Sequence, residues 1–246
     1  MFSTKLSTKK KVCVSLLQLS FFTGLTVLAF DQFSFSTTNS ITALLGLSPS
    51  QNSFAFAQNA THNKVVDDFK RKNKNQDRVN ALGGYWYTAA GAGSEVSPTP
   101  NNFKLSDEGV NGKGKSAKLT GKVTKGGYIS IGTSLSKNGQ PISLAQYKGI
   151  EFWAKGDGKK YGIQLQTPNV IKDYNYYSYV FVAKPQWTHY QIPFDKLTQQ
   201  NWGKKTVRVA LKDSLKQVLT ITWYPHPYGE PRGSVNLAVG DIKLIY

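Results

Sequence analysis

Short segments with alternating apolar and polar residues recur between turn signals along residues 61–246. This period of two is typical of half-buried β-strands, because successive side chains of a strand point to opposite faces. Long helical patterns are missing between these segments, which favours antiparallel pairing in an all-β sandwich or jelly roll. The predicted strands are 65–69, 117–121, 128–131, 150–155, 161–166, 174–182, 187–194, 218–224 and 235–246.

Glycine and proline positions refine this pattern. Gly156-Asp157-Gly158 separates two predicted strands and indicates a β-hairpin. Gly240 interrupts the alternation of the last strand and predicts a bulge. Residues 88–116 are rich in Gly, Ser, Pro, Asn and Lys, so we expect a long loop there, and residues 195–200 suit a short helical turn.

The first 57 residues differ from the rest and predict export. Four lysines precede an uncharged apolar run at 12–30, and Ala55-Phe56-Ala57 has the small-x-small pattern that a signal peptidase recognises. We expect cleavage after Ala57, although the run is also long enough for an uncleaved membrane anchor. Both alternatives carry residues 58–246, predicted to form one domain, out of the cytoplasm to a periplasmic, extracellular or envelope-associated location.

Composition adds constraints to this domain. Aromatic residues make up 13% of the chain, enough for a core with rings left over. The single cysteine, Cys13, lies in the export segment, so the domain has no disulfide, cysteine nucleophile or thiolate-bound metal.

The charge is strongly positive, at +17 for the chain, and residues 58–246 hold 27 basic against 13 acidic side chains. Such a field attracts nucleic acid, anionic membranes or acidic polysaccharides. However, only residues 70–74 form a basic block, and export argues against nucleic acid. We interpret the charge as serving solubility or loose envelope association, with membrane contact only through the N-terminal segment.

Catalytic patterns are weak. The histidines His62, His189 and His226 lack the spacing of a local metal motif, and no Gly-x-Ser-x-Gly elbow occurs. Asp157, Asp173 and Glu230 are acids of the type that a glycosidase pairs, but their sequence positions do not bring them together. The sequence therefore predicts a protein that is not an enzyme.

Several segments, in this order, resemble one family of β-sandwich domains: Val66-Asp67-Asp68-Phe69, Asn80 with Gly83-Gly84 and Trp86, Gly126-Gly127-Tyr128, Tyr147 with Gly149-Ile150, Lys155-Gly156-Asp157-Gly158 before Tyr161, Trp187 with Ile192-Pro193-Phe194, and Gly240-Asp241-Ile242. This series is similar to carbohydrate-binding module family 11 and to the related domain of complex I intermediate-associated protein 30 (CIA30). The resemblance implies a galactose-binding-like sandwich whose concave face holds a glycan in binding modules, whereas CIA30 relatives act as assembly factors for membrane complexes. It also implies that Trp86 and Trp187 belong to the core.

The resemblance also suggests a structural calcium site. Asp68 and Asp241 are candidates to join backbone carbonyls between the terminal strands. The family often ends with two consecutive acids before the final isoleucine, and here Gly240 takes the first of those positions, which weakens the site because calcium needs many oxygen ligands.

A glycan platform needs flat aromatic rings and nearby hydrogen-bonding side chains. Each candidate could instead have a purely structural role. Its ring could pack in the core, its amide could lie on a solvated strand, or it could belong to a simple turn. The candidate ligand-binding residues are Trp153, Gln164, Gln166, Asp173, Tyr174, Tyr176, Tyr177, His226, Tyr228 and Arg232. We therefore expect a non-catalytic module that binds a polysaccharide resembling β-glucan, or alternatively an assembly factor that binds a protein partner.

Overall fold

The computed structural model describes residues 63–71, 76–171, 173–200 and 208–246. Within these ranges no helix has the length and apolar character needed to cross a membrane. The predicted leader, residues 1–57, lies outside the described residues, so export, cleavage and the domain boundary stay predictions.

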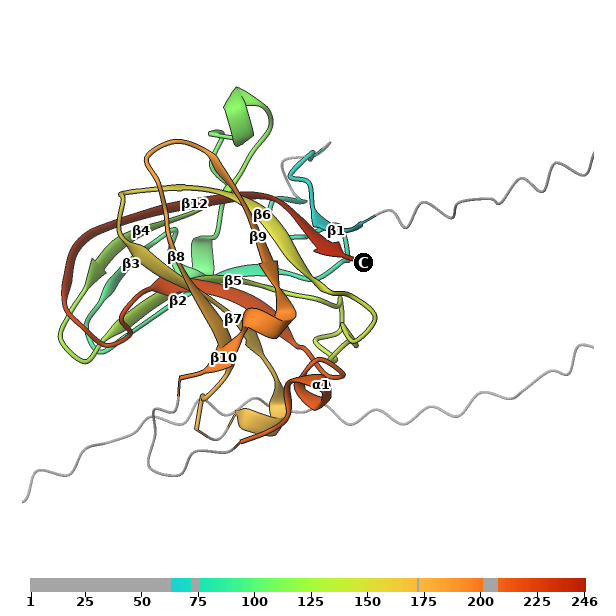
Figure 1. Ribbon diagram of the computed structural model, residues 1–246. Helices are drawn as coiled ribbons and strands as arrows, with labels where there is room; N and C mark the ends of the chain where they lie inside the picture. Colours follow the sequence, from blue (N-terminus) through green and yellow to red (C-terminus); the bar gives the residue numbers. More distant parts are fainter. Residues whose placement is uncertain (1–62, 72–75, 172, 201–207) are drawn as a thin grey trace, which may run out of the picture. The chain divides into compact units, whose positions relative to one another are not determined.

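The described residues form two antiparallel sheets that face each other (Figure 1). The first sheet has the order β3-β4-β12-β6-β9, and β1 also pairs with β12. Its strands are β1 (Lys64–Asp67), β3 (Glu95–Ser97), β4 (Ala117–Val123), β6 (Gly149–Gly156), β9 (Thr188–Pro193) and β12 (Arg232–Ile245).

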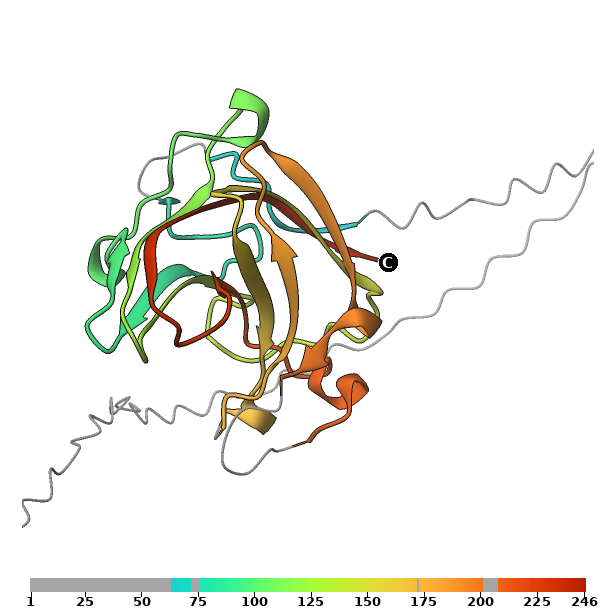
Figure 2. The same cartoon turned by 60° about the vertical axis from the view of Figure 1, so that its left-hand side comes forward.

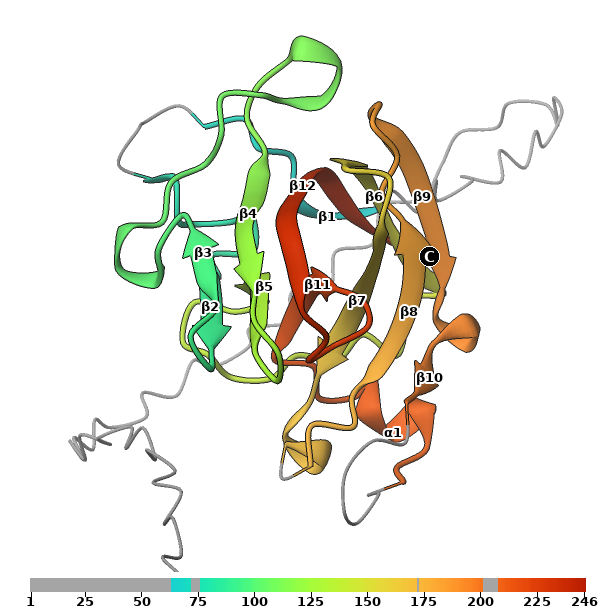
Figure 3. The same ribbon diagram turned by 90° about the vertical axis from the view of Figure 1, so that its left-hand side faces the viewer.

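The second sheet has the order β10-β8-β7-β11-β5-β2 (Figure 3). Its strands are β2 (Trp86–Gly91), β5 (Tyr128–Ser134), β7 (Lys160–Gln166), β8 (Tyr177–Val182), β10 (Thr198–Gln199) and β11 (Thr220–Pro225). The helical elements are short: η2 (Pro100–Asn102), η3 (Val110–Gly112), η4 (Pro168–Val170), η5 (Phe194–Lys196) and α1 (Leu211–Ser214). The all-β sandwich prediction is confirmed.

The core lies between the two layers (Figure 2) and is built from the side chains that point inward from the strands of both sheets. Trp86 from β2 stacks on Trp223 from β11 with ring centroids 6.0 Å apart, and Phe152 from β6 meets Trp223 edge-on at 5.6 Å. All three side chains are almost fully buried. Large rings from both sheets therefore interlock, and burial of such rings is a major source of stability.

Three sequence predictions about local structure are wrong. β6 and β7 belong to different sheets, so Gly156-Asp157-Gly158 crosses between the layers instead of closing a hairpin. The crossing is held by the β8–β9 connection, because Gly156 N donates to Lys184 O and Gly158 N donates to Ala183 O. Residues 88–97 are partly strand, since β2 and β3 pair with β5 and β4. Trp187 is only half-buried and packs near Gly240 on the outer face of the first sheet.

The bulge predicted in the last strand is confirmed. The register of β12 on β6 shifts between Gly240 and Lys243, and Asp241 has a positive φ of 46°. The bulge re-aims β12 so that Ile242 and Leu244 return to the core after the irregular step.

Candidate ligand-binding site

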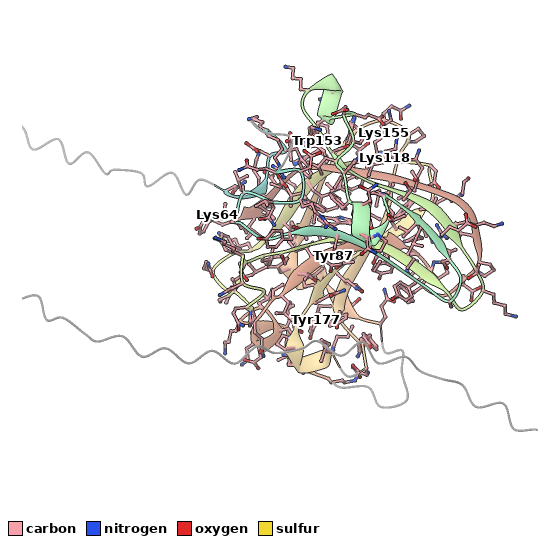
Figure 4. All side chains as sticks on the ribbon, turned by 180° about the vertical axis from the view of Figure 1, so that it is seen from behind. Lys64, Tyr87, Lys118, Trp153, Lys155 and Tyr177 are labelled. Carbon is pink, nitrogen blue, oxygen red and sulfur yellow. The ribbon has the colours of Figure 1, made fainter. Side chains whose placement is uncertain are left out.

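A hollow of about 570 Å³ lies on the outer face of the second sheet. Its floor comes from β2, β5 and β7, and its walls come from the η4–β8 connection and the loop between β11 and β12. Figure 4 shows one of its residues, Tyr87, on β2. The lining residues are Tyr87, Ala89, Tyr128, Ser130, Gln164, Gln166, Ile171, Tyr174, Tyr176 and Tyr228.

Strand alternation explains how the floor is assembled. In β7, Ile163 and Leu165 point into the core, so Gln164 and Gln166 point outward into the hollow. In β2 the same rule applies, because Trp86 and Thr88 are buried and the residues between and after them face outward. The side chains that point outward from these strands are therefore available to a ligand that lies on the sheet.

Aromatic rings form the walls. Tyr174 and Tyr176 meet edge-on with centroids 6.3 Å apart, and Tyr174 at the rim is 59% exposed. On the other wall Tyr228 stacks on Tyr128 at 5.6 Å and meets Tyr224 edge-on at 5.5 Å. Rings that are fixed by other rings lose little freedom when they receive a ligand, so the walls are preorganised for stacking.

The described lining combines apolar surface with hydroxyl and amide groups. Among the described residues that line the hollow, none carries a formal charge at neutral pH, in a chain whose net charge is +17. Burial raises the pKa of Tyr87, Tyr176 and Tyr228, so these hydroxyls stay protonated and can donate hydrogen bonds. Together with the amides of Gln164 and Gln166, they offer donors and acceptors to a neutral, hydroxyl-rich ligand.

Half of the predicted ligand-binding residues meet at this hollow. The five that line it are Gln164, Gln166, Tyr174, Tyr176 and Tyr228. Tyr176 is only 5% exposed, so it supports the wall more than it offers surface.

Two other candidates face away from the hollow. Trp153 lies on β6 of the first sheet, with its ring 5.3 Å from the His189 ring, and Figure 4 shows it grouped with Lys118 and Lys155, apart from Tyr87. Tyr177 pairs with Leu165 and therefore points toward the core, where its hydroxyl donates to Val209 O at 2.7 Å. Tyr176, directly before β8, lines the hollow, so the two neighbouring tyrosines lie on opposite faces.

The last three candidates lie around the site without lining it. Asp173 Oδ1 accepts a hydrogen bond from Asn175 N, which shapes the turn before β8. Arg232 Nη1 donates to Lys160 O at 3.1 Å. His226 lines a separate, open depression of about 540 Å³ over β8 and β10, where burial, Arg232 and Lys160 lower its pKa and keep it neutral.

The carboxylates do not form a catalytic pair in the hollow. Asp157 accepts a hydrogen bond from the Tyr161 hydroxyl and pairs with Lys159, at the crossing between the sheets. Glu230 and Asp173 are also outside the residues that line the hollow. A glycosidase mechanism needs two carboxyl groups flanking the bond to be cut, and the described lining supplies none.

The candidate metal residues lie near the bulge of β12. Burial raises the pKa of Asp241. The nearby Lys243 and Lys70 lower this pKa, whereas the Asp68 and Asp67 carboxylates raise it further. Within the described ranges no three or more His, Cys, Asp or Glu side chains are placed to hold a metal ion. Calcium takes about six to eight oxygens, so a site here needs mainly backbone carbonyls, and structural calcium stays a prediction.

Sequence reasoning missed half of the lining: Tyr87, Ala89, Tyr128, Ser130 and Ile171. Ala89 was hidden because residues 88–116 lack β-branched runs and look like a loop, and Tyr87 lies just before that stretch, outside the predicted strands. A usable signal was the alternation that begins at Trp86, since a buried tryptophan places the next residue on the outer face.

The fold is an antiparallel β-sandwich similar to that of family 11 carbohydrate-binding modules. One similar structure is the family 11 carbohydrate-binding module of a cellulosomal cellulase from Clostridium thermocellum, which is 18% identical, with 74% of this chain and 94% of the module covered and a TM-score of 0.52. Another is the family 11 module from Clostridium thermocellum in complex with a β-1,3-1,4-mixed-linked tetrasaccharide, at 19% identity, 74% and 95% coverage and a TM-score of 0.51. At this identity the likeness establishes the fold.

The sequence then identifies the family. The family model described as complex I intermediate-associated protein 30 (CIA30) matches residues 100–226. The chain belongs to the CIA30 family. A search of curated proteins found no match.

The uncharged lining predicts that ligand affinity is independent of pH. The described lining holds no carboxylate, histidine or lysine, and burial raises the pKa of Tyr87, Tyr176 and Tyr228 above the usual tyrosine value. We expect the dissociation constant for a neutral oligosaccharide, measured by calorimetry, to vary by less than about twofold between pH 5 and pH 9. A steep loss on either side of pH 7 would mean that a titrating group contacts the ligand.

Proposed function

We propose that this CIA30-family protein is a non-catalytic module that binds a neutral glycan, of the β-glucan type, in the hollow of the second sheet, after export from the cytoplasm. The observation that carries the proposal is the lining itself, in which tyrosine rings and two glutamine amides surround the space and none of the described lining residues carries a charge. Sugars present apolar ring faces and hydroxyls at once, and this combination of rings and amides matches both.

The absence of charge among the lining residues that the structure describes argues for a neutral ligand over an acidic one. The protein holds 31 lysine and arginine residues, so an anionic polymer would find many attractive sites on its surface. The hollow instead offers hydroxyl and amide groups, which bind uncharged hydroxyls without displacing ions. Positive charge outside the hollow is then free to serve solubility or loose association with the envelope.

A non-catalytic role is supported by the positions of the acids. A glycosidase would need a pair of carboxylates in the hollow. The candidate acids Asp157, Asp173 and Glu230 do not line it. The two similar binding modules with TM-scores above 0.5 are themselves described as carbohydrate-binding modules.

A second candidate role follows from the family. The description of CIA30 names association with an intermediate of complex I, and the family match supports an assembly factor that holds a protein partner. Such a partner would use the hollow or its rim, where Tyr174 and Ile171 are 59% and 48% exposed. Rings that line a concave hollow favour a sugar over the flat apolar patch typical of protein contacts, so we rank the glycan first.

Affinity electrophoresis against neutral β-glucans and acidic envelope polysaccharides, at low and high salt, tests the proposal. We expect a neutral glucan to retard the protein at both salt concentrations, because hydrogen bonds and stacking are not screened as surface charges are. Gln166→Ala and Tyr174→Ala are expected to weaken binding about tenfold each, the effect of ~1.4 kcal/mol.

The matched controls are Gln140→Ala and Tyr246→Ala, which remove the same groups at exposed positions away from the hollow. These controls should bind like the unmodified protein. Retardation that disappears at high salt, or that responds equally to the controls, would reject the glycan site and leave the assembly role as the better explanation.

A further inference from the structure

Two strand pairs of the second sheet contain three positions at which a glycine lies directly opposite a tyrosine. The register pairs Tyr87 with Gly132 and Gly91 with Tyr128 between β2 and β5, and Tyr224 with Gly162 between β11 and β7. All three tyrosines leave the sheet on the outer face, the face that carries the hollow. The pairs therefore share one arrangement on the face proposed to bind the ligand.

Each tyrosine occupies the space that a side chain on its glycine would need. A Cβ added to Gly132 would lie 2.8 Å from the Tyr87 hydroxyl and 2.9 Å from its Cζ, closer than real Cβ atoms approach, and also 2.8 Å from Thr222 Oγ1, the hydroxyl beside the Tyr87 ring end. At Gly91 and Gly162, ring atoms of Tyr128 and Tyr224 lie closer still to the added Cβ. The rings thus lie down across the neighbouring strand instead of standing away from the sheet.

The backbone gives no other reason for these glycines. None of the three is among the described residues with a positive φ, so an ordinary residue could adopt the same backbone conformation. Other glycines do have backbone reasons: a Cβ at Gly84 would collide with the Ser134 carbonyl, and Gly121 has a φ of 153°. Because a glycine inside a strand weakens the strand, three of them opposite tyrosines suggest a role in placing the rings.

The three rings connect the glycines to the hollow. Tyr87 lines it directly, and its hydroxyl lies 3.2 Å from Thr222 Oγ1 on the next strand but one. Tyr128 also lines the hollow, and Tyr228 is held between Tyr128 and Tyr224. Tyr224 is itself covered and is fixed by Gln200, whose Nε2 donates to its hydroxyl at 2.9 Å.

We propose that Gly91, Gly132 and Gly162 are positioning residues for the ligand, because their missing side chains let Tyr87, Tyr128 and Tyr224 lie against the sheet. Gly132 and Gly91 set the floor of the hollow, and Gly162 sets the wall through Tyr224 and Tyr228. The role in binding rests on the proposed glycan function. The ring placement does not.

The test is a double-mutant cycle on Gly132 and Tyr87 in the full-length protein. Gly132→Ala is expected to lower affinity for a neutral β-glucan oligosaccharide about tenfold by lifting the Tyr87 ring. In a Tyr87→Ala background the same change should lower affinity less than about twofold, because the ring that Gly132 positions is gone. The matched control is Gly233→Ala, since a Cβ at Gly233 meets no atom within 4 Å and its φ is not positive.

Two further measurements separate positioning from folding and from the proposed function. The melting temperature of Gly132→Ala should stay within ~3 °C of the unmodified protein, because the atoms that must move are side-chain atoms, the end of the Tyr87 ring and the Thr222 hydroxyl, and not backbone. The near-ultraviolet circular dichroism of tyrosine should change in Gly132→Ala, and this change should vanish in the Tyr87→Ala background.

Each outcome decides something. Equal losses of affinity in both backgrounds, or an unchanged dichroism spectrum in Gly132→Ala, would overturn the positioning role. If the unmodified protein binds no glucan, the proposed function fails by itself, and the dichroism cycle still decides whether Gly132 places the Tyr87 ring.

Discussion

Replacing Asp67 with asparagine is expected to lower the free energy of unfolding by about 3–5 kcal/mol, the range for breaking a buried ion pair by removing one partner. For a domain of this size each kcal/mol shifts the melting temperature by roughly 2–4 °C, so the midpoint should fall by about 10 °C. The large effect follows from the position of Asp67, whose side chain is fully buried at the end of β1.

Four hydrogen bonds converge on this carboxylate. Oδ1 accepts from Phe69 N at 2.8 Å and from Arg71 Nη1 at 2.7 Å. Oδ2 accepts from Trp86 Nε1 at 2.7 Å and also from Arg71 Nη2. An asparagine has one acceptor oxygen and one NH₂ group, so one pair of donors would face another donor. The Arg71 side chain, only 8% exposed, would keep a buried charge without its counter-ion.

Asp68→Asn is the matched control, since it removes the same charge one residue further along. Asp68 has a side chain that is 40% exposed and pairs at 3.8 Å with Lys70, which is 81% exposed. Exposed pairs of this kind contribute less than about 1 kcal/mol, so the control should unfold nearly like the unmodified protein in urea. Equal midpoints for Asp67→Asn and Asp68→Asn would contradict the role assigned to the buried carboxylate.

The sequence predicts strands well where apolar and polar residues alternate strongly. It predicts poorly which sheet a strand joins, because that choice depends on packing between distant segments. The alternation of Ile163 and Leu165 with Gln164 and Gln166 placed the glutamines on the outer face correctly. The Gly156-Asp157-Gly158 turn has the composition of a hairpin, but its local signal does not say which sheet receives the next strand. That choice depends on β12 pairing with β6 and β11 pairing with β7, and these partners lie far along the chain.

The candidate site was harder to predict than the fold, because it is assembled from separate strands and loops. A cluster such as 174–177 suggests rings on one surface, yet Tyr176 lines the hollow and Tyr177 points into the core. Trp153 has the polar neighbours expected of an exposed platform, but it belongs to the other sheet. Residue type therefore identified five residues that line the hollow, and only the register of the strands decides which rings meet.

Ala89→Trp is expected to remove glycan binding, with a loss of at least about a hundredfold, or ~2.8 kcal/mol. Ala89 lies on β2 and faces outward beside Tyr87, opposite Ser130 on β5, and both Ala89 and Ser130 line the hollow. Their small side chains leave the space between the tyrosines open. An indole at Ala89 would extend into that space and occupy the volume that the ligand needs.

Calorimetry with a neutral β-glucan oligosaccharide measures this loss, and the melting temperature shows whether the fold is kept. We expect the melting temperature to change little, because the new ring enters the hollow and not the core. Ser234→Trp is the control: it adds the same ring on an exposed residue of β12 in the first sheet and should bind normally. If Ala89→Trp binds the glucan as well as Ser234→Trp does, the ligand does not occupy the hollow. The proposal that the second sheet carries the binding surface would then be rejected.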